Sequence, residues 1–249
     1  MNASLLRRLV AEFVGTAILV LFGAGSIVAA MDQGDGTLDY AGLGIVSLAF
    51  AFAVTLAVYT VGAISGAHIN PAVTIALAVV RRFTWAEVTP YVVAQLAGAV
   101  AGALLIVAYA GDRATSSAQV GLTSLATGVS AAQGVLAEGL GTFLLLLVVM
   151  AVAVGHSAPA GWAGLIIGLA VATEIMVIGP FTGGSVNPAR SFGPYLVNQL
   201  FGGSTPWSEY WVYLAGPLVG GGLAAICYEL LARPGAAVPQ PTTPHNGRP

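Results

Sequence analysis

The segments GAHINPA, at residues 66–72, and GGSVNPA, at residues 183–189, decide the fold of this chain. Asn is a strong N-cap, and Pro at the first helical position loses no hydrogen-bond donor that a helix needs. Each Asn-Pro-Ala therefore predicts the start of a helix. The apolar runs after Asn70 and Asn187 are about ten residues long, which is too short to cross a bilayer. We therefore predict two re-entrant segments.

The composition places the chain in a membrane. Hydrophobic residues make up 57% of the sequence and charged residues 7%, against roughly 25% charged residues in a soluble domain. The mean hydropathy is +0.88. The formal net charge is -2 and no basic run occurs, so no nucleic-acid partner is expected. One cysteine, Cys227, excludes an intramolecular disulfide. We expect no metal site and no cofactor.

Six apolar stretches are long enough to span a bilayer. They are Leu9–Ala30, Tyr40–Val61, Thr84–Ala110, Ala132–Val154, Gly161–Ile178 and Trp207–Leu231. The first could also be a signal peptide, because Arg7 and Arg8 precede it. Its apolar run is longer than a signal h-region and contains Glu12, which favours a retained helix.

Arginine positions predict the orientation in the membrane. Six spans place both termini on one side. Six arginines fall on that side, namely Arg7, Arg8, Arg81, Arg82, Arg233 and Arg248, whereas a loop on the other side holds Arg113. The positive-inside rule then makes both termini cytoplasmic. We expect a multi-pass protein of the cell membrane, with residues 233–249, rich in Pro, Thr and Gly, as a disordered cytoplasmic tail.

The two halves of the chain resemble each other. AEFVGT at residues 11–16 resembles AEGLGT at residues 137–142, and LAG at residues 96–98 resembles LAG at residues 214–216. Three spans in each half force the second half to enter from the opposite face. We predict one transmembrane channel domain, residues 1–232, built from inverted repeats at about 8–110 and 131–232. Its functional site is expected where the repeats meet near the midplane.

The short segments predict a polar passage. Inverted symmetry directs the two Asn side chains and the positive ends of both half-helices toward one point, which would repel cations and donate hydrogen bonds to a neutral oxygen. Residues before each Asn cannot be helical, so water or protein must satisfy their carbonyls. These candidate pore carbonyls belong to Gly66, Ala67, His68, Gly183 and Ser185.

These loops resemble the two signature loops of the aquaporin, or major intrinsic protein, family. The resemblance rests on SGAHINPAVT at residues 65–74 and GGSVNPARSFGP at residues 183–194, and it covers residues 8–232. It implies an all-α, right-handed bundle of six transmembrane helices with two re-entrant half-helices. It also implies a homotetramer of single-file water pores that exclude protons. The pore motifs are then Asn70, Pro71, Ala72, Asn187, Pro188 and Ala189.

The resemblance also implies a constriction formed by Phe50, Ile175, Gly184 and Arg190. Water-selective members have His where Ile175 stands, so a less hydrophilic opening is expected. The run GPFTGGSVN at residues 179–187 is similar to the tonoplast intrinsic branch of the family. This similarity implies, as an alternative, a channel that passes ammonia or urea. Glycerol is a further alternative, although Ser191 stands where glycerol-conducting members carry Asp. We expect water and small neutral solutes as the partners of this protein. We also expect the protein to contact a lipid bilayer.

Three carboxylates fall within predicted spans. Glu12 and Glu138 occupy equivalent places in the repeats, so we expect them to accept hydrogen bonds from the re-entrant loops rather than relay protons. Glu174 either has a polar partner inside the bundle or tunes the pore. Only Glu174 could serve the alternative of an ion-coupled transporter. A non-conducting structural protein is disfavoured by the intact Asn pair and Arg190, and an enzyme by the lack of a nucleophile with a base.

Overall fold

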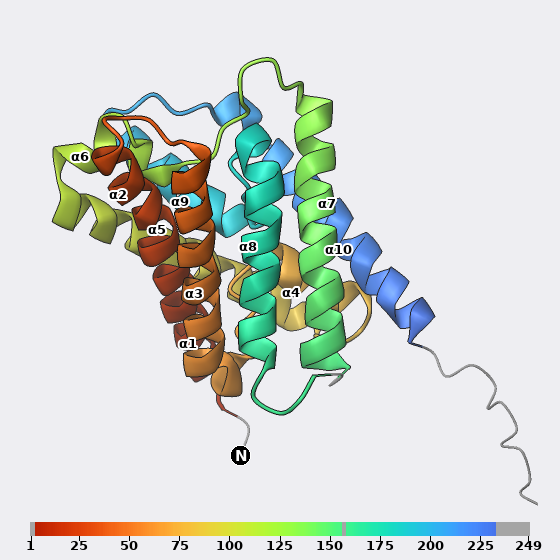
Figure 1. The fold of residues 1–249 in the computed structure, drawn as a ribbon. Coiled ribbons are helices and arrows are strands. Elements are labelled where there is room, and N and C mark those ends of the chain that lie inside the picture. Colours follow the sequence, from red (N-terminus) through yellow and green to blue (C-terminus); the bar gives the residue numbers. More distant parts are fainter. Residues whose placement is uncertain (1–2, 156–157, 233–249) are drawn as a thin grey trace, which may run out of the picture.

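The computed structural model describes residues 3–155 and 158–232. Within these ranges every regular element is a helix (Figure 1). The elements are α1 (Leu5–Ile18), η1 (Leu19–Ala24), α2 (Gly25–Gln33), α3 (Tyr40–Ser65), α4 (Pro71–Val79), α5 (Trp85–Ala110), α6 (Asp112–Thr115), η2 (Gln119–Gly121), α7 (Ala131–Val149), η3 (Met150–Val154), α8 (Ala163–Thr182), α9 (Pro188–Leu200), η4 (Trp207–Glu209) and α10 (Val212–Leu231). The predicted all-α membrane fold is confirmed. The predicted tail, with Arg233 and Arg248, lies outside the described residues.

Six apolar helices of membrane-spanning length occur in the described ranges. The first span is continuous from Leu5 to Gln33 through a π-helical segment, η1. Helices α3 and α8 run four residues beyond the predicted ends of their spans. Each ends at a glycine in the left-handed conformation, Gly66 at φ +91° and Gly183 at φ +82°. Glycine adopts this conformation without a steric cost, so these residues end the helices.

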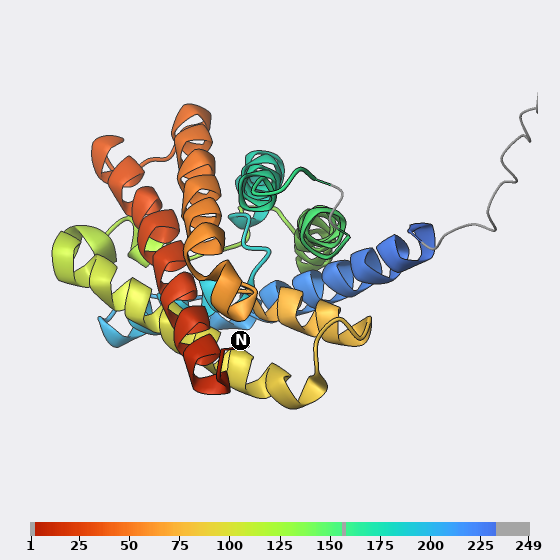
Figure 2. The ribbon, with the colours of Figure 1, turned by 90° about the horizontal axis from the view of Figure 1, so that it is seen from below.

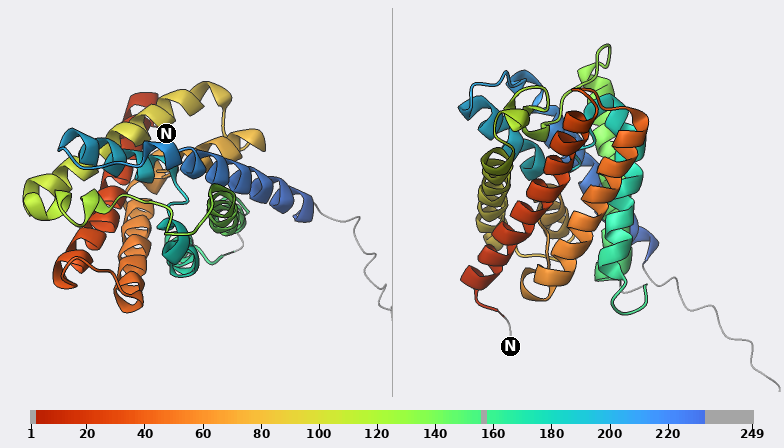
Figure 3. Two further views of the ribbon diagram at one scale, coloured as in Figure 1. Left: turned by 90° about the horizontal axis from the view of Figure 1, so that it is seen from above. Right: turned by 60° about the vertical axis from the view of Figure 1, so that its left-hand side comes forward.

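The two halves are arranged in opposite directions. The start of α1 and the end of α10 lie at the same end of the bundle, whereas α7 begins at the other end (Figures 1 and 3). Half-helix α4 lies toward the first end and α9 toward the second. Each packs against the third span of the other half, α4 against α10 and α9 against α5. Figure 2 shows the first of these contacts from below. The half-helices therefore join the two repeats.

Glycines bring pairs of spans into close contact. A Cβ atom on Gly98 of α5 would collide with the backbone oxygen of Phe13 on α1. In the second half, a Cβ atom on Gly220 of α10 would collide with the backbone oxygen of Gly139 on α7. The third span thus packs closely against the first span in both repeats. Small residues allow membrane helices to approach this closely.

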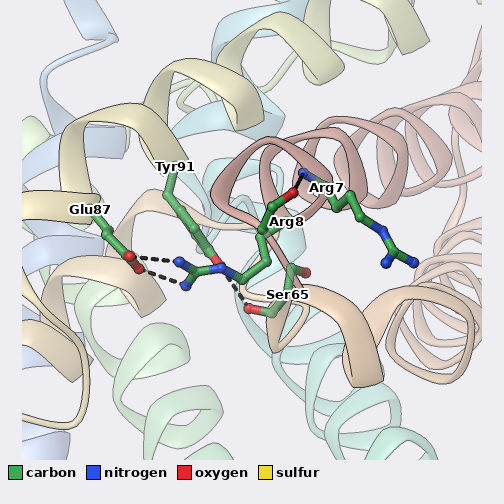
Figure 4. A network of polar contacts seen from close by, with 6 residues as sticks. Arg7, Arg8, Ser65, Glu87 and Tyr91 are labelled. Atoms are coloured by element: carbon green, nitrogen blue, oxygen red, sulfur yellow. Dashed lines mark hydrogen bonds and ion pairs between the residues drawn. The ribbon is translucent and has the colours of Figure 1, made fainter. Parts of the chain in front are cut away.

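Ion pairs tie the helices together at the end that holds Leu5. Both terminal guanidinium nitrogens of Arg8 contact the carboxylate of Glu87, each at 2.6 Å (Figure 4). Next to this pair, the Tyr91 hydroxyl donates to the Ser65 carbonyl at 2.9 Å. Arg82, after α4, bonds Glu229 of α10 at 2.7 Å, and this hydrogen bond raises the pKa of Arg82. These contacts lie on both sides of the first re-entrant loop in the sequence.

Candidate functional site

Both re-entrant loops hold residues in unusual backbone conformations. Ala67 and Ile69 have φ values of +47° and +44°, and Gly184 and Val186 have values of +59° and +45°. Positive φ is strongly disfavoured for a β-branched residue. Such strain persists only where the surroundings impose it. The hydrogen bonds of each loop show what imposes it here.

Glu12 of α1 holds the first loop. Its Oε1 accepts from the Ser65 hydroxyl at 2.6 Å and from the His68 amide at 2.9 Å. Its Oε2 accepts from the Ile69 amide at 2.7 Å and from the Gln95 side chain at 2.8 Å. Lipid could not satisfy these buried amides. One fully buried carboxylate therefore satisfies four donors.

Glu138 of α7 occupies the equivalent place in the second half. Its Oε1 accepts from the Thr182 hydroxyl at 2.7 Å and from the Ser185 amide at 3.0 Å. Its Oε2 accepts from the Val186 amide at 2.7 Å. Three donors thus point at Glu138 among the described residues, against four at Glu12. The two loops are held in the same way, and the second has one donor fewer.

The two asparagines meet at the centre of the bundle. Each side-chain oxygen caps its own half-helix: Asn70 accepts from Ala72 N at 2.8 Å, and Asn187 accepts from Ala189 N at 3.0 Å. Each Nδ2 donates to a carbonyl of the opposite loop, at 2.9 Å in both cases. An amide nitrogen carries two hydrogens. One hydrogen of each asparagine is left to donate elsewhere.

A cavity of about 410 Å³ runs past this pair of asparagines. Candidate pore residues that line it are Phe50, Gly66, Ala67, His68, Asn70, Ile175, Ser185, Asn187 and Arg190. Gly183 and Gly184, which were also expected there, do not line the cavity. Much of the remaining wall is aliphatic, from residues such as Leu145, Val149 and Val171. A passage with aliphatic walls and a few directed polar groups is suited to small polar molecules.

Arg190 lines this cavity and is 1% exposed. Its guanidinium carbon lies 4.9 Å from the centre of the Phe50 ring, and its Nη1 donates to the Gly121 carbonyl at 2.9 Å. Its Nε and Nη2 have no partner among the described residues. A Cβ atom on Gly184 would lie 3.2 Å from the Cα of Ile175. The structure therefore places Phe50 beside Arg190 and Gly184 beside Ile175, and Phe50, Ile175 and Arg190 line the cavity.

Several contacts of the site were missed by the sequence reasoning. Gln95 also donates to the Thr74 hydroxyl at 3.0 Å, and that hydroxyl contacts His68 Nδ1 at 3.1 Å. Gln95 is a polar residue in the middle of an apolar span, which was a signal for such a role. No sequence signal marked Gly121, because its backbone carbonyl makes the contact. The described residues contain no group of three or more His, Cys, Asp or Glu that could hold a metal ion.

The geometry favours the passage of neutral polar molecules over cations. Both half-helices direct their positive ends toward the asparagine pair, and Arg190 adds a full positive charge beyond them. Such an arrangement repels cations and offers hydrogen bonds to oxygen atoms.

The comparisons with known proteins agree with this geometry. The model of the major intrinsic protein family matches residues 1–228. Aquaporin AqpM of Methanothermobacter marburgensis is 46% identical, over 92% of this chain and 98% of the relative. Aquaporin TIP4-4 of Zea mays is 39% identical, over 92% and 87%. The X-ray structure of the aquaglyceroporin from Plasmodium falciparum matches with a TM-score of 0.81 at 25% identity, over 93% of this chain and 98% of that one. The chain belongs to the major intrinsic protein family, whose members are membrane channels for water and small solutes.

Proposed function

We propose that this chain is a passive channel that conducts water in single file and excludes protons and other ions. The observation that carries the proposal is the asparagine pair, in which each Nδ2 keeps one hydrogen for the cavity. A water molecule at this point accepts hydrogen bonds from both amides, so its own hydrogens point away toward the two ends. The water file then has opposite orientations in its two halves, which interrupts proton transfer along it.

The charges around the file favour the same function. The positive ends of α4 and α9 raise the energy of a cation at the centre, and Arg190 raises it again at the constriction. An ion-coupled transporter needs a cation site at the midplane. The donors of Asn70 and Asn187 disfavour such a site.

Small neutral solutes are a second candidate cargo. Ile175 gives the constriction an aliphatic wall, and Gly184 leaves the space beside Ile175 without a side chain. Both features favour solutes that are larger or less polar than water. Ser191, where glycerol-conducting members carry Asp, bonds Thr123 at 2.9 Å and Ser185 at 2.6 Å. Its hydroxyl thus supports the loop, which favours ammonia or urea over glycerol.

We further propose one channel domain over residues 1–232, placed in the plasma membrane with both termini in the cytoplasm and assembled as a homotetramer. Arg7 and Arg8 lie in the first turn of α1, and Arg81 and Arg82 fall between α4 and α5, at the end of the bundle where α1 begins. Arg113 lies at the opposite end, near Asp32. Reporter fusions at the C-terminus test the orientation. The mass of the intact assembly, measured after the detergent has been removed, tests the oligomeric state.

Stopped-flow light scattering of proteoliposomes tests the main proposal. Purified protein should raise osmotic water permeability above that of protein-free vesicles, with a low activation energy and no dependence on voltage or on a proton gradient. Glycerol, urea and ammonia fluxes, measured in the same vesicles, define the range of solutes. Water flux that vanishes without a proton or sodium gradient would overturn the proposal in favour of a coupled transporter.

A further inference from the structure

Glu174 is a buried carboxyl group in the cavity wall that the proposed function does not use. It is 2% exposed, and neither of its carboxylate oxygens has a hydrogen-bond partner among the described residues. It lines the same cavity as Ile167 and Val171 of α8 and directly precedes Ile175. This spacing of three and four residues places Glu174 on the cavity face of the helix.

The contents of the cavity are the remaining source of hydrogen bonds for this carboxyl group. A buried polar group without a partner costs free energy, and lipid supplies no donors. Ionisable residues within membrane spans accordingly face other polar groups or a water-filled cavity. No described protein group bonds Glu174, and Glu174 lines the cavity, so molecules in the cavity can supply the missing hydrogen bonds.

The space for the Glu174 carboxyl comes from a glycine on the neighbouring span. A Cβ atom on Gly141 of α7 would lie 3.2 Å from Glu174 Oε2, 2.7 Å from Ile178 Cδ1 and 2.8 Å from Val186 Cγ1. The carboxyl group thus lies beside α7 and close to Val186 of the second re-entrant loop.

The inverted repeat has no such group in its first half. There the equivalent glycine is Gly15, whose added Cβ atom would meet Ile69, Val61 and, at 4.0 Å, the methyl group of Ala57. Ala57 therefore occupies the position that Glu174 occupies in the second half. The bundle can be built with a methyl group at this position, so the fold itself does not require a carboxyl group there.

Donors lie in the same cavity as this acceptor. Nε and Nη2 of Arg190 are buried and have no partner among the described residues. A molecule between Arg190 and Glu174 therefore finds donors on one side and an acceptor on the other.

We propose that Glu174 and Arg190 form a subsite that selects small amides, such as urea and formamide. The carbonyl oxygen of the amide accepts from the guanidinium of Arg190, and its N–H group donates to the carboxyl of Glu174. Glu174, next to Ile175 in the chain, is thus a specificity-determining residue. The inference rests on the proposed function, because it requires a conducting channel.

The test measures the ratio of urea to water permeability in the same proteoliposomes for the wild type and three variants. Glu174→Leu removes the acceptor at a similar volume, and Glu174→Gln keeps one acceptor oxygen without a charge. Asp112→Asn removes an exposed carboxyl on α6, outside the cavity lining, and serves as the matched control.

The Leu variant should lower the ratio about five-fold, as expected for the loss of one hydrogen bond. The Gln variant should keep the ratio within about two-fold of the wild type, because it retains an acceptor. The Asp112 control should match the wild type. An unchanged ratio in the Leu variant would overturn the inference.

Wild-type protein provides an independent measurement if the Leu variant does not fold. Urea at equal concentration on both sides should occupy the subsite and lower osmotic water permeability in a saturable manner. Water flux that urea leaves unchanged at every concentration would overturn the subsite and leave the proposed channel function intact. Absence of any protein-dependent water flux would instead overturn the proposed function itself.

Discussion

Removal of the Glu12 carboxylate should unfold the protein rather than alter its selectivity. In Glu12→Ala, four donors lose their acceptor at once. Two of them are the backbone amides of His68 and Ile69, which cannot rotate toward another partner. At about 1 kcal/mol for each unsatisfied donor, the lower limit for such groups, the loss is about 4 kcal/mol.

The inverted repeat supplies an internal comparison. Glu138→Ala removes the acceptor of three donors, so the same reasoning gives a loss of about 3 kcal/mol. Glu229→Ala is a matched control, because Glu229 makes a partly exposed ion pair with Arg82. Exposed pairs contribute at most about 1 kcal/mol. Stability should therefore fall in the order wild type, Glu229→Ala, Glu138→Ala, Glu12→Ala.

The free energy of unfolding can be measured by titrating the protein with sodium dodecyl sulfate in bicelles and following helix content and tryptophan fluorescence. Water and proton fluxes of the folded fraction are measured in proteoliposomes in parallel. The reasoning is refuted if Glu12→Ala stays within about 1 kcal/mol of the wild type, the limit for the surface control, while its proton or water flux changes. That outcome would assign Glu12 to the conduction path.

Three further predictions follow from the packing and the charges. Arg190→Val should admit cations and larger solutes that the wild type excludes, as measured by ion and solute flux in proteoliposomes; unchanged exclusion would argue against a role in the constriction. Gly98→Val would force a side chain against the backbone of Phe13, so it should lower the free energy of unfolding by at least about 1–3 kcal/mol in the same bicelle titration. Gly222→Ala is the control and should leave the free energy of unfolding unchanged, because nothing lies within 4 Å of its Cβ position. Arg82→Ala, which breaks a partly exposed ion pair, should change stability by less than about 1 kcal/mol in that titration, and a larger loss would show that the pair holds the first loop.

The fold class and the approximate positions of the six spans could be predicted from the sequence, because hydrophobic length and the Asn-Pro pairs depend on local chemistry. The ends of α3 and α8 were placed too early, at Val61 and Ile178. In the structure both helices continue to the glycines that end them, Gly66 and Gly183. The length of an apolar run underestimates the length of these helices, because small and polar residues beyond the run remain helical when the protein packs around them.

The backbone of the loops could not be predicted. Local preference disfavours positive φ at Ile69 and Val186, and the structure imposes it through glutamates far away in the chain. The pair of Arg8 and Glu87 joins residues 79 positions apart, and no local pattern links them. Such contacts depend on tertiary packing. The roles of the constriction residues stay predictions until solute fluxes are measured.

The hydrogen bonds of the two loops imply an order of assembly during biosynthesis. When the first loop enters the membrane, its acceptor Glu12 is already in place on α1, and the second loop likewise finds Glu138 on α7. Each half can therefore satisfy its own loop as it leaves the ribosome, N-terminal half first. The reciprocal bonds of Asn70 and Asn187 need both halves and form last. The asparagine pair at the centre of the bundle is thus complete only after the second half has folded.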